Sequence, residues 1–419
     1  MKILWLGGIV LPRIAKQEDL PLNNMNGWLI KTSENMPEGT SLVYVFDSDR
    51  EIKGSTEFYN YYGIKCDKSS VDRFGDSYII PAMKILEEET PDIVHIWGTE
   101  GSHSLAMVEA CERIGIVDKV IISIQGLVSE YYHHYTAYLP HKIVARHTLR
   151  DLLKGNLQKG RDVFYKRGIL EQEAIRRVKH VIGRTDWDRG CAWDINPNVQ
   201  YHFNNEILRD EFYEGEWSYA DCEKYSIFCS QGHYPIKGIH LVIESLNRIV
   251  KDYPDAHLYI GGKDYLSLPF YKQSSYGKYL VSLIKQYNLE KNVSFTGFLN
   301  AEQMKNRYLK SNVFVSASSI ENSPNSLGEA MLLGVPCVSS QVGGVHNMMT
   351  HAIEGYTYPA DEVYMLAYYV NCIFADSENA SLMAQRGREH AKITHCPETN
   401  MKQLLEIYQG VADWKGIIR

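Results

Sequence analysis

Residues 318–344 read SSIENSPNSLGEAMLLGVPCVSSQVGG, and this stretch decides the fold. The apolar run before it predicts a strand that ends at Ser318, and a helix is expected to start near Asn325 or Ser326. The Gly-Val-Pro that begins at Gly334 predicts the end of this helix, because glycine closes helices and proline cannot continue them. A helix that starts at the carboxyl edge of a parallel sheet points unpaired N–H groups outward. The stretch therefore predicts a phosphate site.

Two carboxylates bracket the expected helix start. Glu321 lies in the loop, and Glu329 follows eight residues later, in the predicted first turn. The pattern Ser326-x-x-Glu329 also fits a capping box, in which the glutamate only bonds the N-cap amide. Two acids would repel a phosphate unless they face hydroxyl groups instead. Glu321 beside Glu329 therefore favours a ligand that combines phosphate, bound by backbone amides, with sugar hydroxyls.

Short β-branched runs alternate with longer helical periodicities on both sides of this stretch, which is typical of parallel α/β layers. In the first half, strands are predicted at 2–8, 41–46, 92–98, 119–126, 179–184 and 199–203. In the second half, strands are predicted at 226–231, 257–262, 293–298, 313–318 and 336–341. The long stretch 127–177 is expected to be helical. We predict two doubly wound parallel sheets with ligand at the carboxyl ends of the strands.

The length of the chain favours two domains, because 419 residues exceed what one hydrophobic core usually organises. The polar, acidic segment 210–223 is the natural linker. We expect a first domain over 1–212 and a second over 213–399. A helix over 400–419 is expected to pack back on the first domain.

The composition indicates an ordinary soluble globular protein, with 44% hydrophobic and 23% charged residues. The apolar run at the start of the sequence is too short for a signal peptide or a membrane span. Eight cysteines are scattered and form no C-x-x-C pair, which argues against structural zinc and against a disulfide framework. We therefore expect a cytoplasmic protein.

Charge is distributed unevenly along the chain. The net charge of −7 disfavours a nucleic-acid binder. Residues 141–180 carry eleven Lys or Arg against four acids, a net of +7, so the remainder carries −14. This basic stretch fits a solvated helical face. It also fits a patch that docks on anionic lipid headgroups or on a lipid-phosphate acceptor, at the inner face of a membrane.

The second half resembles the retaining glycosyltransferases of family 4, which have the GT-B fold. The E-x7-E pair, the run EAMLLGVPCV and Gly343-Gly344 carry the resemblance, together with Lys237-Gly238 after the first strand of the second domain. The family implies two Rossmann-like parallel-sheet domains that face a central cleft. It also implies a nucleotide-sugar donor and transfer with retention of anomeric configuration, and we predict no metal and no other cofactor.

The resemblance assigns roles to residues of the second domain. Glu329 would bind the donor ribose, Glu321 would sit near the sugar ring, and Lys237 would neutralise the diphosphate leaving group. Further donor contacts are expected from the backbone amides of Asn325, Ser326 and Leu327 and from Gly232 and Gly262. Relatives often carry an arginine where this chain has Gly232-His233, so one cation is missing or comes from elsewhere.

The first domain offers weaker candidates. Gly27, in an Asn-Gly pair, would open a helix close to the donor, although such a pair also fits a simple turn. Gln125 stands where relatives often place a histidine, and an amide there cannot act as a base. His103, Glu100 and Arg184 are candidates for the acceptor side, with Thr185-Asp186 beside Arg184 fitting a plain helix cap equally well.

Two histidine and aspartate patterns are interpreted as structural. His95 lies inside a predicted strand and is expected to be a core residue. Asp47-Ser48-Asp49 imitates a metal-binding D-x-D motif but lacks a supporting pattern, so we interpret it as a turn.

The expected function is transfer of a sugar from a nucleotide diphosphate, such as UDP, to a saccharide or lipid-linked saccharide. The resemblance points to capsular or other surface polysaccharide synthesis. Residue types around Gly262 and over 295–298 do not select uracil over guanine. Two alternatives stay open: a UDP-sugar 2-epimerase of the same fold, and a non-catalytic glycan-binding partner of another glycosyltransferase.

Overall fold

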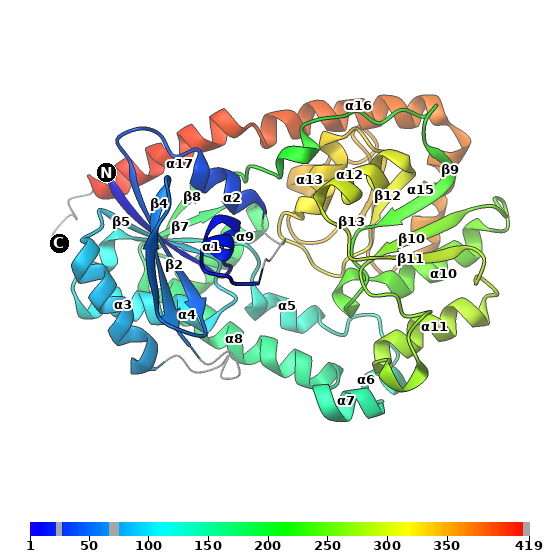
Figure 1. Cartoon of the computed structure of the whole chain (residues 1–419). Coiled ribbons are helices and arrows are strands. Elements are labelled where there is room, and N and C mark those ends of the chain that lie inside the picture. The colour runs from blue at the N-terminus through cyan, green and yellow to red at the C-terminus, as the bar shows by residue number, and fades with distance from the viewer. Residues whose placement is uncertain (22–26, 67–74, 414–419) are drawn as a thin grey trace. The chain divides into compact units, whose positions relative to one another are not determined.

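The computed structural model describes residues 1–21, 27–66 and 75–413, and it divides into two compact units (Figure 1). The first unit contains residues 1–131, 163–207 and 395–419, and the second contains 132–162 and 208–394. Each unit is built on its own sheet. Residues 132–162, which fall in the expected first domain, pack with the second unit, and the other boundaries lie at 207 and 394, five residues before the expected 212 and 399.

The first unit contains, within the described residues, an eight-stranded sheet in the order β3-β4-β2-β1-β5-β6-β7-β8. All neighbours pair in parallel except β3 and β4. The strands are β1 (Lys2–Gly7), β2 (Ser41–Ser48), β3 (Ile52–Ser55), β4 (Tyr59–Lys65), β5 (Ile93–Trp97), β6 (Val120–Ser123), β7 (His180–Gly183) and β8 (Gln200–Phe203).

Helices cover both faces of the first sheet. One apolar cluster lies under α3 (Asp76–Glu89), α4 (Ser102–Arg113), α8 (Leu157–Arg177) and α9 (Asp186–Ile195). The other lies under α1 (Pro12–Gln17), α2 (Gly27–Glu34) and α17 (Pro397–Ala412). Strand β1 reads KILWLG and is buried between them, as a central parallel strand requires.

Helix α17 is fixed to the first sheet by polar contacts as well as by apolar packing. The buried hydroxyl of Tyr408 accepts a hydrogen bond from Trp5 Nε1 at 3.0 Å. The same hydroxyl contacts Nδ1 of His95. His95 is fully buried and also contacts Ser123 Oγ through Nε2 at 2.7 Å, so it is the core histidine that the sequence predicts.

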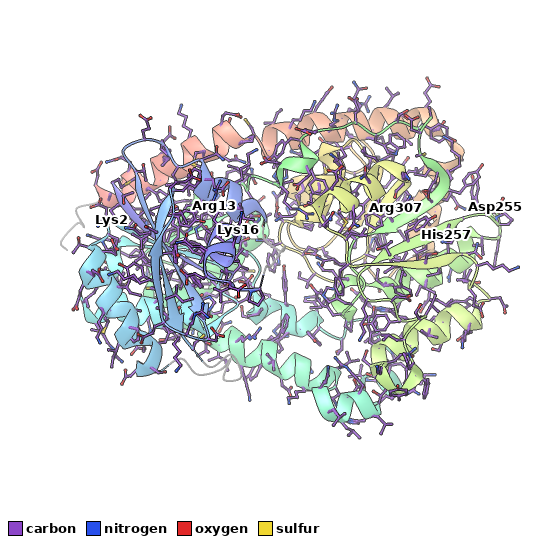
Figure 2. The ribbon with its side chains drawn as sticks, viewed as in Figure 1. Lys2, Arg13, Lys16, Asp255, His257 and Arg307 are labelled. Atoms are coloured by element: carbon purple, nitrogen blue, oxygen red, sulfur yellow. The ribbon has the colours of Figure 1, made fainter. Side chains whose placement is uncertain are left out.

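The second unit contains, in its described part, a six-stranded parallel sheet in the order β11-β10-β9-β12-β13-β14. Its strands are β9 (Glu223–Cys229), β10 (His257–Gly261), β11 (Val293–Gly297), β12 (Ser311–Ser316), β13 (Cys337–Ser340) and β14 (Tyr356–Tyr358). His257 begins β10, and Arg307 pairs with Glu223 at the start of β9. His257 and Arg307, both labelled in Figure 2, therefore mark the amino edge of this sheet.

Helices cover this sheet on both faces too. One core cluster joins α10 (Ile239–Ile249), α11 (Ser275–Gln286) and α15 (Val363–Ala375) to the strands. The other joins α12 (Ala301–Lys310), α13 (Asn325–Leu332), α14 (Val345–Met348) and α16 (Ser377–Thr394).

The stretch 127–177 is helical in pieces. It forms α5 (Val128–His134), α6 (His141–Val144), α7 (Leu149–Lys154) and the long α8. Leu139, Ile143 and Leu157 join the core of the second unit, which explains why residues 132–162 belong there.

Candidate functional site

Lys237 and Glu321 form an ion pair at the carboxyl edge of the second sheet. Lys237 ends a short 3₁₀ turn after β9, η3 (Pro235–Lys237), and Glu321 lies in the loop between β12 and α13. Ser318 donates its hydroxyl to Glu321 Oε1 at 2.7 Å. Burial favours the neutral amine, but the carboxylate of Glu321 holds the pKa of Lys237 above its ordinary value. The ammonium of Lys237 therefore stays charged where it contacts Glu321.

Two glycines of the predicted motifs shape the loops that carry this pair. Gly238 has φ +66°, and a Cβ there would lie 1.8 Å from the carbonyl oxygen of Ala317. Gly343 has φ +49°, and a Cβ there would lie 1.8 Å from the carbonyl oxygen of Glu321. The Gly344 amide donates to that same carbonyl at 3.1 Å. Only glycine allows both backbones to approach so closely.

Helix α13 begins beside this pair. Its N-cap is Pro324, which has no side chain able to cap, and Asn325 and Ser326 are its first two residues. The alternative of a capping box around Ser326 is therefore wrong, and Glu329 is the fifth residue of the helix rather than part of its first turn. The Leu327 amide already donates to the carbonyl of Pro324 at 2.9 Å. The prediction that Leu327 offers its N–H to phosphate does not fit this geometry.

Glu329 is held by an arginine that the sequence motifs do not include. Nε and Nη2 of Arg209 donate to Glu329 Oε1 at 2.9 and 2.7 Å. Glu329 is 5% exposed. Burial raises its pKa to about 6, and Arg209 opposes the rise. Arg209 lies just before η2 (Asp210–Phe212), in a segment that no local pattern marks as functional.

Gly232 and Gly262 follow β9 and β10 and approach one another. A Cβ on Gly262, where φ is +101°, would lie 3.8 Å from the amide nitrogen of Gly232 and 3.8 Å from His233 Nδ1. Burial and the charge of Lys237 lower the pKa of His233, which favours its neutral form. The second unit therefore gathers most of the predicted donor residues at one edge of its sheet.

The candidate site residues of the first unit make contacts that stabilise the fold of this unit. Arg184 is 6% exposed, and its Nη1 forms an ion pair with Glu206 Oε2 at 2.8 Å. Its Nη2 donates to the backbone oxygen of Gln125 at 3.0 Å, and Gln125 and Arg184 line one small cavity within this unit. Thr185 caps α9 in a capping box with Asp188, so the helix-cap reading of this segment is confirmed.

Glu100 and His103 lie at the carboxyl edge of the first sheet. The carboxylate of Glu100 accepts the amides of Thr99 at 3.0 Å and of Gly126 at 3.1 Å, and burial raises its pKa. His103 contacts Asp47 Oδ2 through Nδ1 at 3.0 Å. Asp47 and Ser48 are the last two residues of β2 rather than part of a turn, which corrects the interpretation of Asp47-Ser48-Asp49.

Gly27 begins helix α2, as the sequence predicts, while the preceding Asn26 lies outside the described residues. All eight cysteines are free thiols. Among the described residues, no three His, Cys, Asp or Glu side chains gather in a way that could hold a metal ion. Metal independence stays a prediction. Over the same residues, no helix is long and apolar enough to span a bilayer.

Comparison with known proteins gives this geometry a family context. Residues 217–390 match the family model of glycosyl transferases group 1. The second unit thus carries a glycosyltransferase group 1 domain. The putative glycosyltransferase YtcC of Bacillus subtilis is 30% identical over 183 residues, which cover 42% of this chain and 43% of YtcC. The uncharacterized glycosyltransferase MJ1607 of Methanocaldococcus jannaschii is 25% identical over 58% of this chain and 56% of that protein. The chain thus spans about half the length of these curated relatives.

Solved structures match over nearly the whole chain. Sucrose-phosphate synthase from Thermosynechococcus elongatus has a TM-score of 0.72 at 14% identity, covering 98% of this chain and 99% of that one. Anabaena HepE in complex with UDP has a TM-score of 0.68 at 15% identity, covering 98% and 100%. Likeness at this level of identity concerns the fold, and it confirms the predicted GT-B fold with two Rossmann-like parallel-sheet domains.

Proposed function

We propose that the chain is a retaining glycosyltransferase of family 4 that uses a nucleotide-diphosphate sugar as donor. The observation that carries the proposal is the convergence of Lys237, Glu321 and the start of α13 at one edge of the second sheet. An ammonium group and a helix N-terminus beside each other suit a diphosphate. Glu321 then has the sugar hydroxyls within its reach, as the sequence resemblance implies.

Glu329 suits the ribose because of how Arg209 holds it. Both guanidinium bonds end on Oε1. Among the described contacts, Oε2 is therefore the oxygen that can accept a ribose hydroxyl. Arg209 keeps the buried carboxylate ionised, and an ionised carboxylate accepts hydrogen bonds more strongly than a neutral acid. Glu329 would thus bind the ribose of the donor, and Glu321 would bind its sugar.

The costly event in sugar transfer is departure of the nucleotide diphosphate as the anomeric carbon becomes cation-like. The bond from the anomeric carbon to the phosphate oxygen breaks, and a bond to the acceptor oxygen forms on the same face. The acceptor proton passes to the departing phosphate oxygen. Preorganised positive charge lowers this barrier, and Lys237 with the amides at Asn325 and Ser326 would supply it.

The acceptor we propose is a saccharide or a lipid-linked saccharide of surface polysaccharide synthesis, with the basic stretch 141–180 facing an anionic membrane. Part of that stretch is already neutralised within the first unit: Arg176 pairs with Glu173, Arg177 with Glu112, and Lys179 with Asp118. Other cations of the stretch lie in both units: Lys142, Arg146, Lys154 and Lys159 belong to the second, and Lys166 and Arg167 to the first.

A two-step experiment tests the function. Calorimetry with UDP, GDP and ADP comes first, and UDP is the first choice because HepE is solved with it. NMR of the matching nucleotide sugar, with and without saccharide acceptors, comes second. Transfer only with acceptor supports the proposal, and 2-epimerisation without acceptor would identify the epimerase instead. Failure to bind any nucleotide would favour the non-catalytic partner.

A further inference from the structure

Helix α7 has its polar and apolar sides exchanged relative to an ordinary surface helix. Its carboxylate residue, Asp151, is 4% exposed, whereas Leu149, Leu152 and Leu153 are 67%, 70% and 87% exposed. A surface helix normally turns its leucines to the core and its acids to water. Exposing three neighbouring leucine side chains to water costs free energy.

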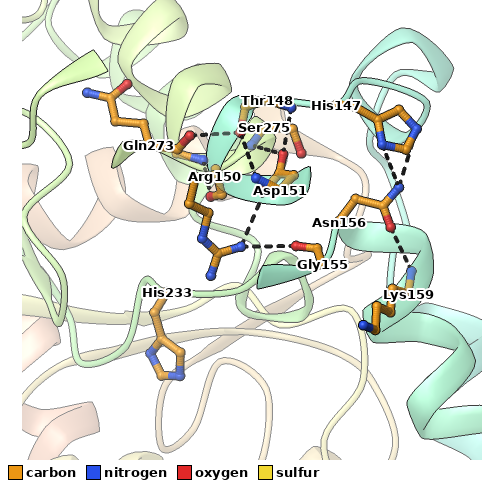
Figure 3. A network of polar contacts seen from close by, with 12 residues as sticks. His147, Thr148, Arg150, Asp151, Gly155, Asn156, Lys159, His233, Gln273 and Ser275 are labelled. Carbon is orange, nitrogen blue, oxygen red and sulfur yellow. Dashed lines mark hydrogen bonds and ion pairs between the residues drawn. The ribbon is translucent and has the colours of Figure 1, made fainter. Parts of the chain in front are cut away.

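The buried side of α7 explains why the helix sits this way (Figure 3). Thr148 caps the helix and forms a capping box with Asp151. Asp151 Oδ2 also accepts the amide of Ser275, at the start of α11, at 2.9 Å. The Thr148 hydroxyl donates to the carbonyl of Gln273 at 3.0 Å. These buried bonds fix α7 to the segment before α11 and hold its leucines outward.

The segment before α11 adds two exposed aromatic rings. It contains the 3₁₀ turn η4 (Phe270–Lys272), which contacts α7. Phe270 is 68% exposed and Tyr271 is 59% exposed. We call Leu149, Leu152, Leu153, Phe270 and Tyr271 together the α7–η4 face. Buried hydrogen bonds from Thr148 and Asp151 to Gln273 and Ser275 hold α7 beside the residues that follow η4.

Cations surround the α7–η4 face. The ammonium of Lys278 lies 3.4 Å from the centroid of the Phe270 ring, and that of Lys272 lies 5.9 Å from the Tyr271 ring. Burial together with the charges of Arg150 and Lys154 lowers the pKa of Lys263. Such mutual repulsion shows that these cations stand close together.

The sequence around the face is strongly positive. Residues 141–160 contain five Lys or Arg against one acid, and residues 263–278 contain three against one. The acid of the first segment is the buried Asp151, which pairs with Arg150 through Oδ1 at 3.3 Å, so the segment keeps a net charge of +4. An apolar centre with a positive rim is the pattern of a surface that lies in the headgroup region of an anionic bilayer.

We infer that the α7–η4 face inserts into the headgroup layer of an anionic membrane. The leucines and the two rings enter the boundary of the acyl chains, while the surrounding Lys and Arg side chains contact lipid phosphates. A second copy of this chain fits less well, because a two-fold interface would place the same positive patch against itself. The inference rests on the membrane side of the proposed function and names the surface that makes the contact, whereas nucleotide binding and sugar transfer are tested separately.

Vesicle co-sedimentation tests the inference directly. The wild-type protein is expected to bind vesicles of phosphatidylcholine with 30–40% phosphatidylglycerol at low salt, to leave them at about 0.5 M salt, and to ignore pure phosphatidylcholine. The double variant Leu152→Gln, Leu153→Gln is expected to lose at least tenfold in vesicle affinity. The matched control Leu382→Gln, Ile393→Gln changes two leucine-sized side chains on α16 that are 48% and 75% exposed, and it should bind like wild type.

Two further measurements keep the inference falsifiable. Leu153→Trp is expected to show a blue-shifted emission on anionic vesicles and quenching by brominated acyl chains. Equal vesicle affinity of the double variant and the control would overturn the inference, as would equal binding to neutral vesicles. A dimer in sedimentation velocity that only the double variant disrupts would assign the face to a second copy instead.

Discussion

Replacing Arg209 by methionine should make nucleotide binding depend on pH in a calculable way. The carboxyl of Glu329 is buried, and it faces Arg209, Glu211 and Tyr308. Breaking a buried ion pair costs about 3–5 kcal/mol, and the Arg209 side chain is 21% exposed, so a loss of about 2 kcal/mol is a fair expectation. That energy is equivalent to raising the pKa of the Glu329 carboxyl by about 1.5.

The direction of the pH dependence follows from which protonation state of Glu329 binds the nucleotide. If the ionised carboxylate accepts the ribose hydroxyls, protonation weakens binding, and Arg209→Met moves protonation from about 6 in the wild type toward neutral pH. The affinity ratio of wild type to variant should then be roughly 15 at pH 6, roughly four at pH 7 and close to one at pH 9. Recovery at pH 9 also shows that the variant remains folded.

Calorimetric titration of the nucleotide from pH 6 to 9 measures this ratio. Arg307→Met is the matched control, because Arg307 binds Glu223 at the amino edge of the same sheet (Figure 2), with Nη2 and Oε2 2.9 Å apart. Glu329→Gln should lose affinity at every pH. A loss in Arg209→Met that stays constant from pH 6 to 9 would refute the reasoning, because a direct or purely structural role of Arg209 would not titrate.

Four further outcomes are expected. Lys237→Ala and Glu329→Ala should each lower sugar transfer at least tenfold, on the order of 1.4 kcal/mol of barrier, and wild-type rates in both purified variants would remove the site assignment. Gly238→Ala should lower transfer while far-ultraviolet circular dichroism is retained, because the new Cβ would meet the Ala317 carbonyl; an unchanged rate would count against the loop argument. Burial lowers the pKa of His240 to about 4, so the contribution of His240 to the free energy of unfolding is complete above about pH 6.5 and falls as the pH drops toward 4. His240→Phe should reduce this acid dependence of the free energy of unfolding by up to about 3 kcal/mol in urea titrations, and an unchanged dependence would contradict the prediction. Transfer should persist in EDTA, and loss of activity that Mg²⁺ or Mn²⁺ restores would show a metal requirement.

Local patterns predicted the central strands of both sheets. Strands such as β1 and β12 are buried on both faces, so their apolar runs are continuous and easy to recognise. The strands β3, β4 and β14 were missed because they are short or rich in Tyr, Asn and Gly, with no continuous aliphatic run. The missed strands thus lie at one end of each sheet, while the edge strands β8 and β11 at the opposite ends were predicted.

The candidate site shows the same limit. Glu321, Glu329, Lys237 and Gly343 lie in short sequence motifs, so their spacing can be recognised without the structure. Arg209 reaches Glu329 across 120 positions of sequence, and Arg184 meets Glu206 inside the first unit. Neither ion pair produces a periodic pattern or a local bias in composition in the sequence. Ion pairs between distant segments need the folded chain before they can be recognised.

The seating of α17 on the first sheet has a consequence for synthesis on the ribosome. Trp5 is translated 403 residues before Tyr408, which bonds to it. Until residues near 408 have been translated, the apolar surface around β1 that contains Trp5 lacks its cover from Leu404, Tyr408 and Val411. The residues that complete the first unit are therefore translated only after the whole second unit.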